Sequence, residues 1–307
     1  MKQALKMTAM ALLVAAVGFT GCKRQQEDNE QAIQNLLNAS GYTDENQSRS
    51  YGVDDSTPEP GGDPGPGMDG YERIPLVRFR RFVPHSGVSR NINFQIPAYP
   101  GCPDTTALAT VTTDIHGELR TAFDTTTNPI QVWRKPFYDI AVRKVLLGKD
   151  RDGWHIRKVS PLKVTTRNAP YDLRLTRVFA VGALSHDTFE LTTTDTLLSK
   201  DQLPWFTPGD TVTVSVEVAS TGDSCWAFLH HGRPPRPWRQ AYFRTSTWTF
   251  ERTWVIGDSG TRIVRPSVHD AIGWGSLWAD TSMPYVAAAW AVPYIVRNSG
   301  EPVPDDQ

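Results

Sequence analysis

The sequence predicts a mainly β protein in which an α+β segment precedes an all-β segment. Between Ala107 and Phe123 small or apolar side chains occupy most odd positions, and this period of two is typical of a half-buried strand. From Tyr171 onward, short β-like runs alternate with turn-forming residues. A short helical pattern over residues 27–41 precedes both segments. We therefore expect a helix with a curled antiparallel sheet, followed by a β-sandwich.

The chain begins with a pattern typical of a secretory signal peptide. Lys2 and Lys6 are followed by thirteen uncharged residues, Met7–Phe19, which is shorter than the about 20 residues that span a bilayer as a helix. The residues FTGC, which end at Cys22, resemble the lipobox of bacterial lipoproteins. The resemblance implies that residues 1–21 are removed and that acyl chains on Cys22 anchor the protein to a membrane outside the cytoplasm, in the bacterial cell envelope. The alternative is an ordinary cleaved signal with an incidental cysteine.

The charge balance gives the chain no overall attraction to nucleic acid. The sequence has 32 basic and 33 acidic residues, and without Lys2 and Lys6 it keeps 30 against 33, a net charge of −3. One local basic cluster lies in VRFRRFVPHSGVSR. It could bind a polyanion, although arginines on a strand more often form a solvated face. Its members are Arg78, Arg80, Arg81 and Arg90.

Cys102 and Cys225 are the cysteines that remain after the anchor. An oxidising compartment permits a disulfide between them, which would join the two predicted domains. The alternative is two isolated free thiols. No further Cys or His stands near either residue at the spacing of a zinc site, so we predict no metal and no other cofactor.

The sequence of residues 22–70 predicts a short helix followed by a spacer. In EDNEQAIQNLLNASG the side chains of Ile33, Leu36 and Leu37 share one helical face, which should pack on the first domain or on a partner. The stretch DDSTPEPGGDPGPGMDGYE has a composition that does not order itself by burying apolar surface. We expect a flexible spacer that holds the folded domains away from the membrane.

The first predicted domain covers residues 71–168. FYDIAVRKVLLG and GWHIRKVSPLKV predict two strands after the alternating stretch, joined by the turn-like sequence GKDRDG. Gly117 inside the alternating stretch suggests a bulge, or a turn that divides it into two strands. One helix followed by a curled antiparallel sheet is an α+β plan, and it resembles the cystatin-like or NTF2-like layout.

The second predicted domain covers residues 171–297, with a disordered polar tail at residues 298–307. PGDTVTVSVEVAS places four valines on one face, and CWAFLHH, TWTFERTWVI and TRIVRPSV predict further strands. The last strand, PYVAAAWAVPYIV, is apolar on both faces, which indicates burial on both sides or a covered interface. Short strands with turn signals between them resemble an immunoglobulin-like β-sandwich in architecture.

The sequence offers no set of residues for which we predict catalysis. IGDSGT around Ser259 resembles the sequence around the nucleophile of chymotrypsin-like proteases, and Asp139 and His85 would complete a triad. The two predicted domains separate Asp139 from Ser259, and GDSG between two strands fits a hairpin turn. The adjacent His230 and His231 would point to opposite faces of a strand and would not readily share a metal. We therefore expect the protein not to be an enzyme.

Tryptophan is the feature that suggests binding. The chain has ten tryptophans, and all but Trp133 and Trp154 follow residue 171. Most of them fit a sandwich core, where aromatic side chains bury large apolar areas. Three stand in the turn-rich stretches RPPRPWRQ and GWGSLWAD, where an exposed indole can contact a partner or stack on a sugar. The candidate binding residues are Trp238, Trp274 and Trp278, with Arg236 and Arg239 beside Trp238.

These observations favour a non-catalytic envelope lipoprotein that acts as an interaction or accessory module for protein partners. The alternative is a glycan-binding lipoprotein that uses the loop tryptophans. Burial distinguishes the two hypotheses. Exposure of the candidate tryptophans along one face favours sugar binding, whereas an exposed last strand favours a protein partner.

Overall fold

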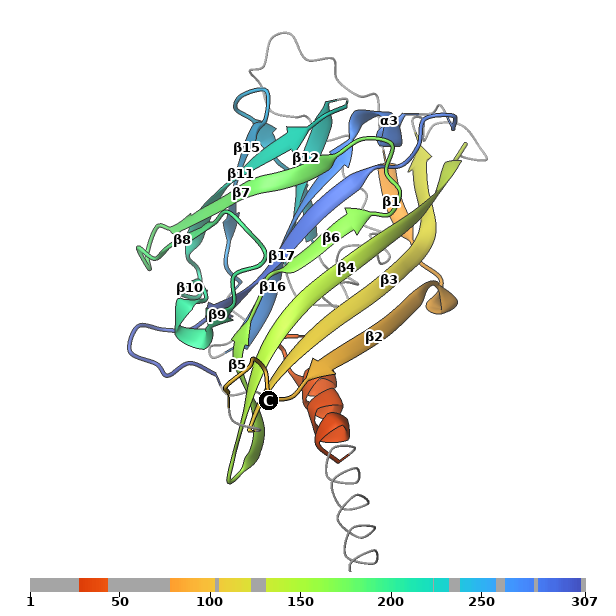
Figure 1. The fold of residues 1–307 in the computed structure, drawn as a ribbon. Coiled ribbons are helices and arrows are strands. Elements are labelled where there is room, and N and C mark those ends of the chain that lie inside the picture. The colour runs from red at the N-terminus through yellow and green to blue at the C-terminus, as the bar shows by residue number, and fades with distance from the viewer. Residues whose placement is uncertain are drawn as a thin grey trace, which may run out of the picture.

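The structure is a computed structural model of the whole chain. It describes residues 28–43, 78–102, 105–122, 131–222, 224–231, 238–257, 263–278 and 281–304. These residues form a mainly β protein with a large, curled and largely antiparallel sheet, as predicted (Figure 1). The lipobox, the predicted spacer, Arg236 and Ser259 lie outside the described residues.

The described strands form two sheets. The path of the 12-stranded sheet is β1 (Arg78–Phe82), β3 (Thr106–Ala122), β4 (Trp133–Asp150), β6 (Leu162–Thr166), β17 (Ala287–Val296), β16 (Ile263–Gly273), β12 (Cys225–His231) and β13 (Trp238–Ala241). Off this path lie β2 (Val88–Gln95), β5 (Gly153–Val159), β9 (Leu198–Ser199) and β10 (Trp205–Phe206). The 5-stranded sheet runs β14 (Phe243–Arg244), β15 (Thr249–Val255), β11 (Thr211–Ser220), β7 (Leu173–Gly182) and β8 (Thr188–Leu191). Two single-turn helices, η1 (His85–Gly87) and η2 (Lys200–Gln202), join strands.

The alternating pattern after residue 105 is confirmed as one long strand. β3 buries its odd positions on the concave face of the sheet, with Ala107, Ala109, Val111, Ile115 and Leu119 among them. Gly117 does not divide the strand. A Cβ at Gly117 would lie 2.4 Å from the carbonyl oxygen of Phe82 and 2.8 Å from the Phe137 ring, so glycine lets β1 and Phe137 approach its backbone.

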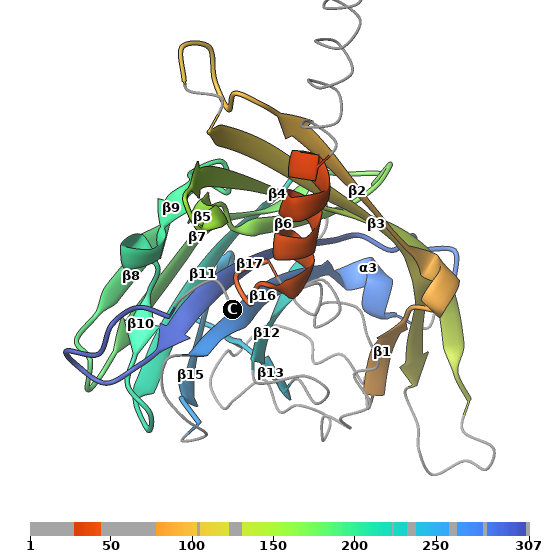
Figure 2. The same cartoon turned by 90° about the horizontal axis from the view of Figure 1, so that it is seen from below.

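The predicted amphipathic helix forms over residues 28–39 and lies across the concave side of the large sheet (Figure 2). Ile33 and Leu37 are fully buried in the main hydrophobic core, and Leu36 packs against it. Lys149 Nζ, near the tip of the β4–β5 hairpin, donates to Asn29 Oδ1 at 2.8 Å. The described helix that packs on the core therefore precedes the proline-rich stretch in the sequence.

The large sheet continues across the boundary that we predict between residues 168 and 171. β6 of the first segment pairs with β17 of the second, with Val164 opposite Ala289. The 5-stranded sheet packs on the other face of β16 and β17, and one hydrophobic core contains residues of both segments. β17 is buried at all ten positions, because its two faces contact different parts of the core. The last strand is therefore covered within the chain.

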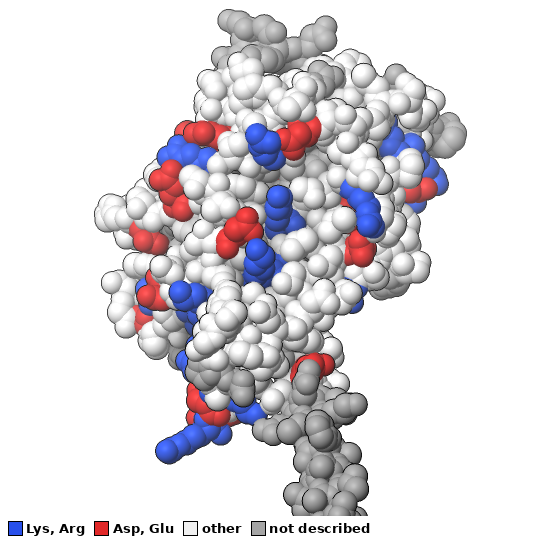
Figure 3. All heavy atoms as spheres, viewed as in Figure 1, with Lys and Arg blue, Asp and Glu red and all other residues white. Residues whose placement is uncertain are grey.

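The arginine cluster and the C-terminal residues are less exposed than their sequences suggest. Arg81 is buried, and basic and acidic side chains are interspersed on the face shown in Figure 3.

Pro304 is also buried, and the Tyr42 hydroxyl donates to its carbonyl oxygen at 2.8 Å. Residues 298–304 of the predicted tail thus run onto the core.

Candidate functional site

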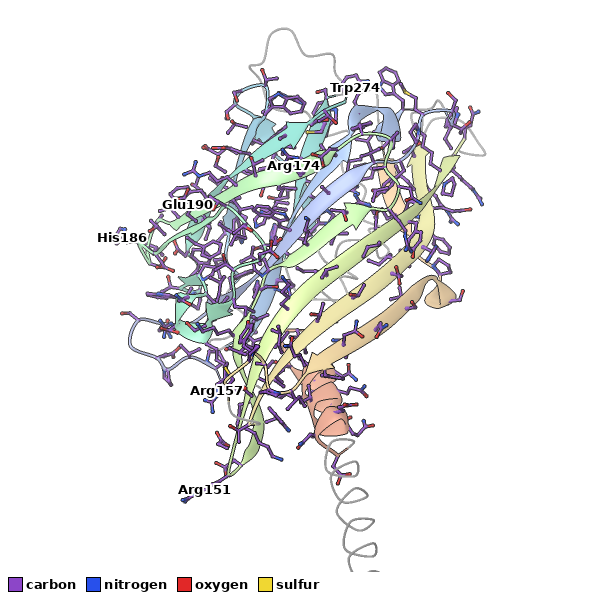
Figure 4. The ribbon with its side chains drawn as sticks, viewed as in Figure 1. Arg151, Arg157, Arg174, His186, Glu190 and Trp274 are labelled. Carbon is purple, nitrogen blue, oxygen red and sulfur yellow. The ribbon has the colours of Figure 1, made fainter. Side chains whose placement is uncertain are left out.

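Two of the predicted binding tryptophans lie together at one end of the molecule. Trp274 begins the short helix α3 (Trp274–Leu277), and Trp278 follows it directly. The Trp274 ring lies 5.5 Å from that of Trp278 and 6.1 Å from that of Trp226 on β12, centroid to centroid. All three side chains are half-buried. We call Trp226, Trp274 and Trp278 the tryptophan cluster; Figure 4 labels Trp274 at the end of the molecule opposite the β4–β5 hairpin that carries Arg151.

The backbone beneath the cluster is held by hydrogen bonds to Val286 and Lys135. The Gly273 N–H donates to the Val286 carbonyl at 2.9 Å. Ser276 Oγ accepts the Val286 N–H at 2.8 Å and donates to the carbonyl of the same residue at 3.1 Å. Lys135 Nζ, from β4, donates to the Gly275 carbonyl at 2.5 Å. α3 is therefore fixed in place although a single helical turn is not stable alone.

A guanidinium and an apolar side chain border the cluster. The Arg244 guanidinium lies 6.0 Å from the Trp226 ring centroid and donates to the Thr247 carbonyl at 2.6 Å. Met283 is 38% exposed and packs close to α3. The indole N–H groups of Trp226 and Trp278 are buried and have no hydrogen-bond acceptor in the described part of the chain. Such donors are costly to leave unpaired in a folded protein.

Arg239, another candidate of this group, does not join the cluster. Trp238 pairs with His231 through its backbone in β13, but its side chain lies outside the described residues, as does all of Arg236. Arg239 is buried, and its guanidinium lies 3.6 Å from the Phe79 ring centroid. It also donates to the Phe79 carbonyl at 2.9 Å. Arg239 therefore points into the curled sheet toward β1.

The bridge considered between Cys102 and Cys225 is not formed, since both residues are free thiols. Cys225 is fully buried in β12, and this burial raises the pKa of its thiol to about 12, although Arg244 opposes the shift. Cys102 lies half-buried in the turn after β2. A disulfide is not needed to hold the two segments together, because the continuous sheet already joins them.

A charged network lies on the concave face of the large sheet. Arg81 on β1 forms a bidentate ion pair with Asp270 on β16, at 2.6 and 3.0 Å. Arg81 Nε also donates to the Tyr285 hydroxyl at 2.7 Å, and that hydroxyl donates to Asp139 Oδ2 at 2.9 Å. His230 Nε2 lies 3.3 Å from Asp270 Oδ2. We call Arg81, Asp139, His230, Asp270 and Tyr285 the charged network.

Electrostatics keep the carboxylate of Asp270 ionised in this network. Burial alone would raise the pKa of Asp270, but Arg81 and His230 bring it below its ordinary value. Asp139 accepts from Thr166 Oγ1 at 2.8 Å as well as from Tyr285. The carboxylates thus serve as acceptors that tie β1, β4, β6 and β16 together.

A second polar cluster lies on the opposite face of β16, between the two sheets. The Tyr242 hydroxyl is 2.7 Å from His269 Nδ1, and Ser267 Oγ is 3.3 Å from His269 Nε2. Ser267 donates to the Val292 carbonyl at 3.2 Å, so its oxygen accepts from His269 Nε2–H and Tyr242 donates to Nδ1. Burial, with a smaller effect of His230, lowers the pKa of His269 to about 3. We call Tyr242, Ser267 and His269 the neutral relay.

The three residues of the protease-like pattern, His85, Asp139 and Ser259, form no site within the described part of the chain. Asp139 belongs to the charged network, while Ser259 and the side chain of His85 lie outside the description. In the described ranges no three His, Cys, Asp or Glu residues are grouped to hold a metal ion. No helix in those ranges combines the length and the apolar character needed to cross a membrane.

Comparison with protein-family models, curated proteins and solved structures finds no match to this chain. The site therefore rests on its own geometry. Sequence reasoning assigned Trp226 to the core and missed its contact with Trp274. The two side chains meet because β12 pairs with β16, with Trp226 opposite Ile272. A single sequence does not reveal which distant strands pair, so the contact could not be predicted.

Proposed function

We propose that this chain is a lipid-anchored, non-catalytic interaction module of the bacterial cell envelope that contacts protein partners through its tryptophan cluster. Tryptophan and methionine are enriched at protein interfaces, and a rigid aromatic surface loses little entropy on binding. The cluster combines three neighbouring indoles, of which Trp226 and Trp274 are stacked, with the exposed Met283 and a backbone fixed by hydrogen bonds. These properties fit a preformed contact surface.

The position of the cluster relative to the anchor is the observation that carries the proposal. The helix over residues 28–39 begins six residues after Cys22, and six residues span at most about 20 Å. The described helix starts at the end of the molecule opposite Trp274 (Figures 1 and 4). Lipidation of Cys22 would therefore hold the body close to the membrane and leave the tryptophan cluster facing away from it, accessible to a partner.

Capture from native envelopes tests the contact surface. The tagged, lipidated chain is purified after gentle solubilisation, and co-purifying proteins are identified and quantified by mass spectrometry. We expect Trp274→Ala with Trp278→Ala to lose the stoichiometric partner, because truncation of central aromatic residues typically costs 2 kcal/mol or more per residue, about 30-fold in affinity. Trp205→Ala is the matched control, a half-buried tryptophan on β10. Equal loss in the control, or retention in the double variant, would contradict the proposal.

Fractionation tests the anchor separately. Cys22→Ala should move the protein from the membrane to the soluble fraction, since the acyl chains provide the attachment. Cys102→Ala is the control and should leave the protein in the membrane fraction. Retention of the Cys22 variant on membranes would refute the anchor without bearing on the tryptophan cluster.

A glycan is the second candidate ligand. The rings of Trp226 and Trp274 are inclined by 23°, and flat, stacked indoles also suit the apolar faces of sugars. Recovery of the chain alone from envelopes, with tryptophan fluorescence that changes on addition of envelope polysaccharide, would favour this candidate. Loss of that fluorescence response in Trp278→Ala would locate the sugar at the cluster.

The finer fold assignments remain part of this proposal. The packing of residues 28–39 on the curled sheet supports the cystatin-like or NTF2-like layout of the first segment. The packing of the 5-stranded sheet against β16 and β17 supports a sandwich in the second, for which the immunoglobulin-like type stays a prediction.

A further inference from the structure

β2 differs from the other strands at the edges of the two sheets. It has eight residues, and β3 is the one strand that pairs with it in the described chain. The other edges of the 12-stranded sheet in the described residues are β1, with five residues of which three are arginine, β13, with four, and β9 and β10, with two each. The edges of the smaller sheet, β8 and β14, have four and two residues. Figure 1 shows β2 along the border of the sheet, with no drawn strand beyond it.

Proteins usually protect such an edge from pairing with another chain. Short length, charges, proline and bulges are the common devices. β2 has none of them except the single charge of Arg90: its sequence VSRNINFQ contains no proline, and its pairing with β3 runs without a register shift. In the part of the chain that the structure describes, the outward backbone donors and acceptors of β2, a row of about 26 Å, pair with no further strand.

We propose that β2 pairs antiparallel with β2 of a second copy of this chain, about a two-fold axis at Ile92. A two-fold axis at a residue keeps odd positions opposite odd ones, so the convex faces of the two sheets remain on the same side. The result is one continuous sheet through both copies. This self-association goes beyond the proposed function and does not use the tryptophan cluster.

The side chains of β2 are compatible with this register on both faces. On the convex face Asn91 faces Asn93 of the second copy, and Ser89 faces Gln95; all four side chains are exposed and uncharged. On the concave face Ile92 faces its own counterpart, and Arg90, whose guanidinium donates to Asn38 Oδ1 of its own chain at 2.6 Å, faces Phe94. No like charges meet, polar residues face polar ones, and the arginine lies opposite an aromatic ring. Cross-strand pairs of these kinds stabilise a sheet.

The size of the contact predicts a weak dimer. One pair of eight-residue strands lies at the small end of specific interfaces, which typically bury about 1,200–2,000 Å². We therefore expect association that depends on protein concentration. Confinement of both copies to one membrane would raise their effective concentration and favour pairing.

Charge placed on the edge tests the proposal in the full-length chain. Two copies with different tags are co-expressed, and capture of one is followed by quantification of the other. Asn91→Lys with Asn93→Lys in both copies puts lysine opposite lysine at two symmetric pairs, and we expect co-capture to fall about tenfold. Combining this copy with one that carries Asn91→Glu and Asn93→Glu should restore it.

Thr110→Lys with Thr112→Lys is the matched control. These residues pair with Asn93 and Asn91 and lie on the same face, one strand away from the edge. The control should co-capture like the wild type. The proposal is overturned if the wild-type chain captures no second copy, if the Asn91 and Asn93 lysines have no effect, or if the control loses capture equally. A wild-type chain that pairs its β2 with a different protein and not with itself overturns it as well.

Discussion

Strand β16 separates two buried polar clusters that are built on opposite principles. His269 and Asp270 are adjacent in sequence, so their side chains point to opposite faces of the strand. Asp270 faces the concave side and joins the charged network with Arg81 and His230. His269 faces the 5-stranded sheet and joins the neutral relay with Tyr242 and Ser267. Both residues are at most 2% exposed.

The difference shows how each side of the strand tolerates polar groups. The concave face uses full charges that compensate one another, and removal of one leaves the other buried and unpaired. The space between the sheets uses neutral donors and acceptors in one chain that ends at a backbone carbonyl. The two clusters should therefore differ in the size of their contribution to stability and in the pH at which each is lost.

The largest effect should come from Asp270→Ala in the charged network. Removal of the carboxylate leaves the Arg81 guanidinium buried without its counter-ion, which typically costs about 3–5 kcal/mol of unfolding free energy. Arg81 and Asp270 belong to different segments of the chain. We therefore expect the whole protein to unfold in a single transition in urea, with the lower free energy of unfolding read from that transition. Asp195→Ala breaks the exposed pair with Lys144 and should cost less than about 1 kcal/mol. Similar losses of unfolding free energy in Asp270→Ala and Asp195→Ala would contradict the importance that we assign to the charged network.

Acid should affect the neutral relay before the charged network. The folded pKa of His269 is about 3 and that of His231 about 4, both depressed by burial from an ordinary value of 6.5. Below pH 6.5 the unfolded chain therefore binds more protons than the folded chain does. As the pH falls, the free energy of unfolding should decrease by about 1.4 kcal/mol per pH unit for each histidine. Asp270, with a pKa below 3.8, keeps its contribution above that pH and loses it only as the pH falls through its folded pKa.

Denaturation at pH 7.5 and pH 5.0 measures this dependence. The variant His269→Gln should show a smaller loss between the two pH values, by about 2 kcal/mol, because one depressed histidine is gone. The variant Asp270→Asn is the control and should keep the wild-type pH dependence over this range. An unchanged dependence in His269→Gln would show that the relay is not the acid-sensitive element.

The smallest effect should come from Tyr242→Phe in the neutral relay. The change removes one hydroxyl and leaves His269 Nδ1 without its donor, which costs about 1–2 kcal/mol for a buried acceptor. Tyr99→Phe, at a tyrosine that is 42% exposed, is the control and should leave the denaturation midpoint unchanged. A loss in Tyr242→Phe as large as that in Asp270→Ala would mean that the two faces do not differ as we infer.

The sequence by itself determined the local structure of this protein. Period-two alternation identified β3 and β11, and the spacing of Ile33, Leu36 and Leu37 identified the helix, because the buried side of a strand or helix repeats at a fixed interval. The apolarity of the last strand on both faces correctly indicated burial on both sides. The sequence also named Trp274 and Trp278, together with Trp238, as candidate binding residues, and the structure places Trp274 and Trp278 side by side around α3.

Only the tertiary structure decided which distant segments meet. The pairing of β6 with β17 joins two stretches that composition separates, and the curl of the sheet brings Arg81 to Asp270 and Arg239 to Phe79. Trp226 reaches Trp274 through the register of β12 and β16. Such contacts depend on strand order and register, which arise from the summed packing of the whole core. A local pattern records which face of a strand is buried but not which strand lies beside it.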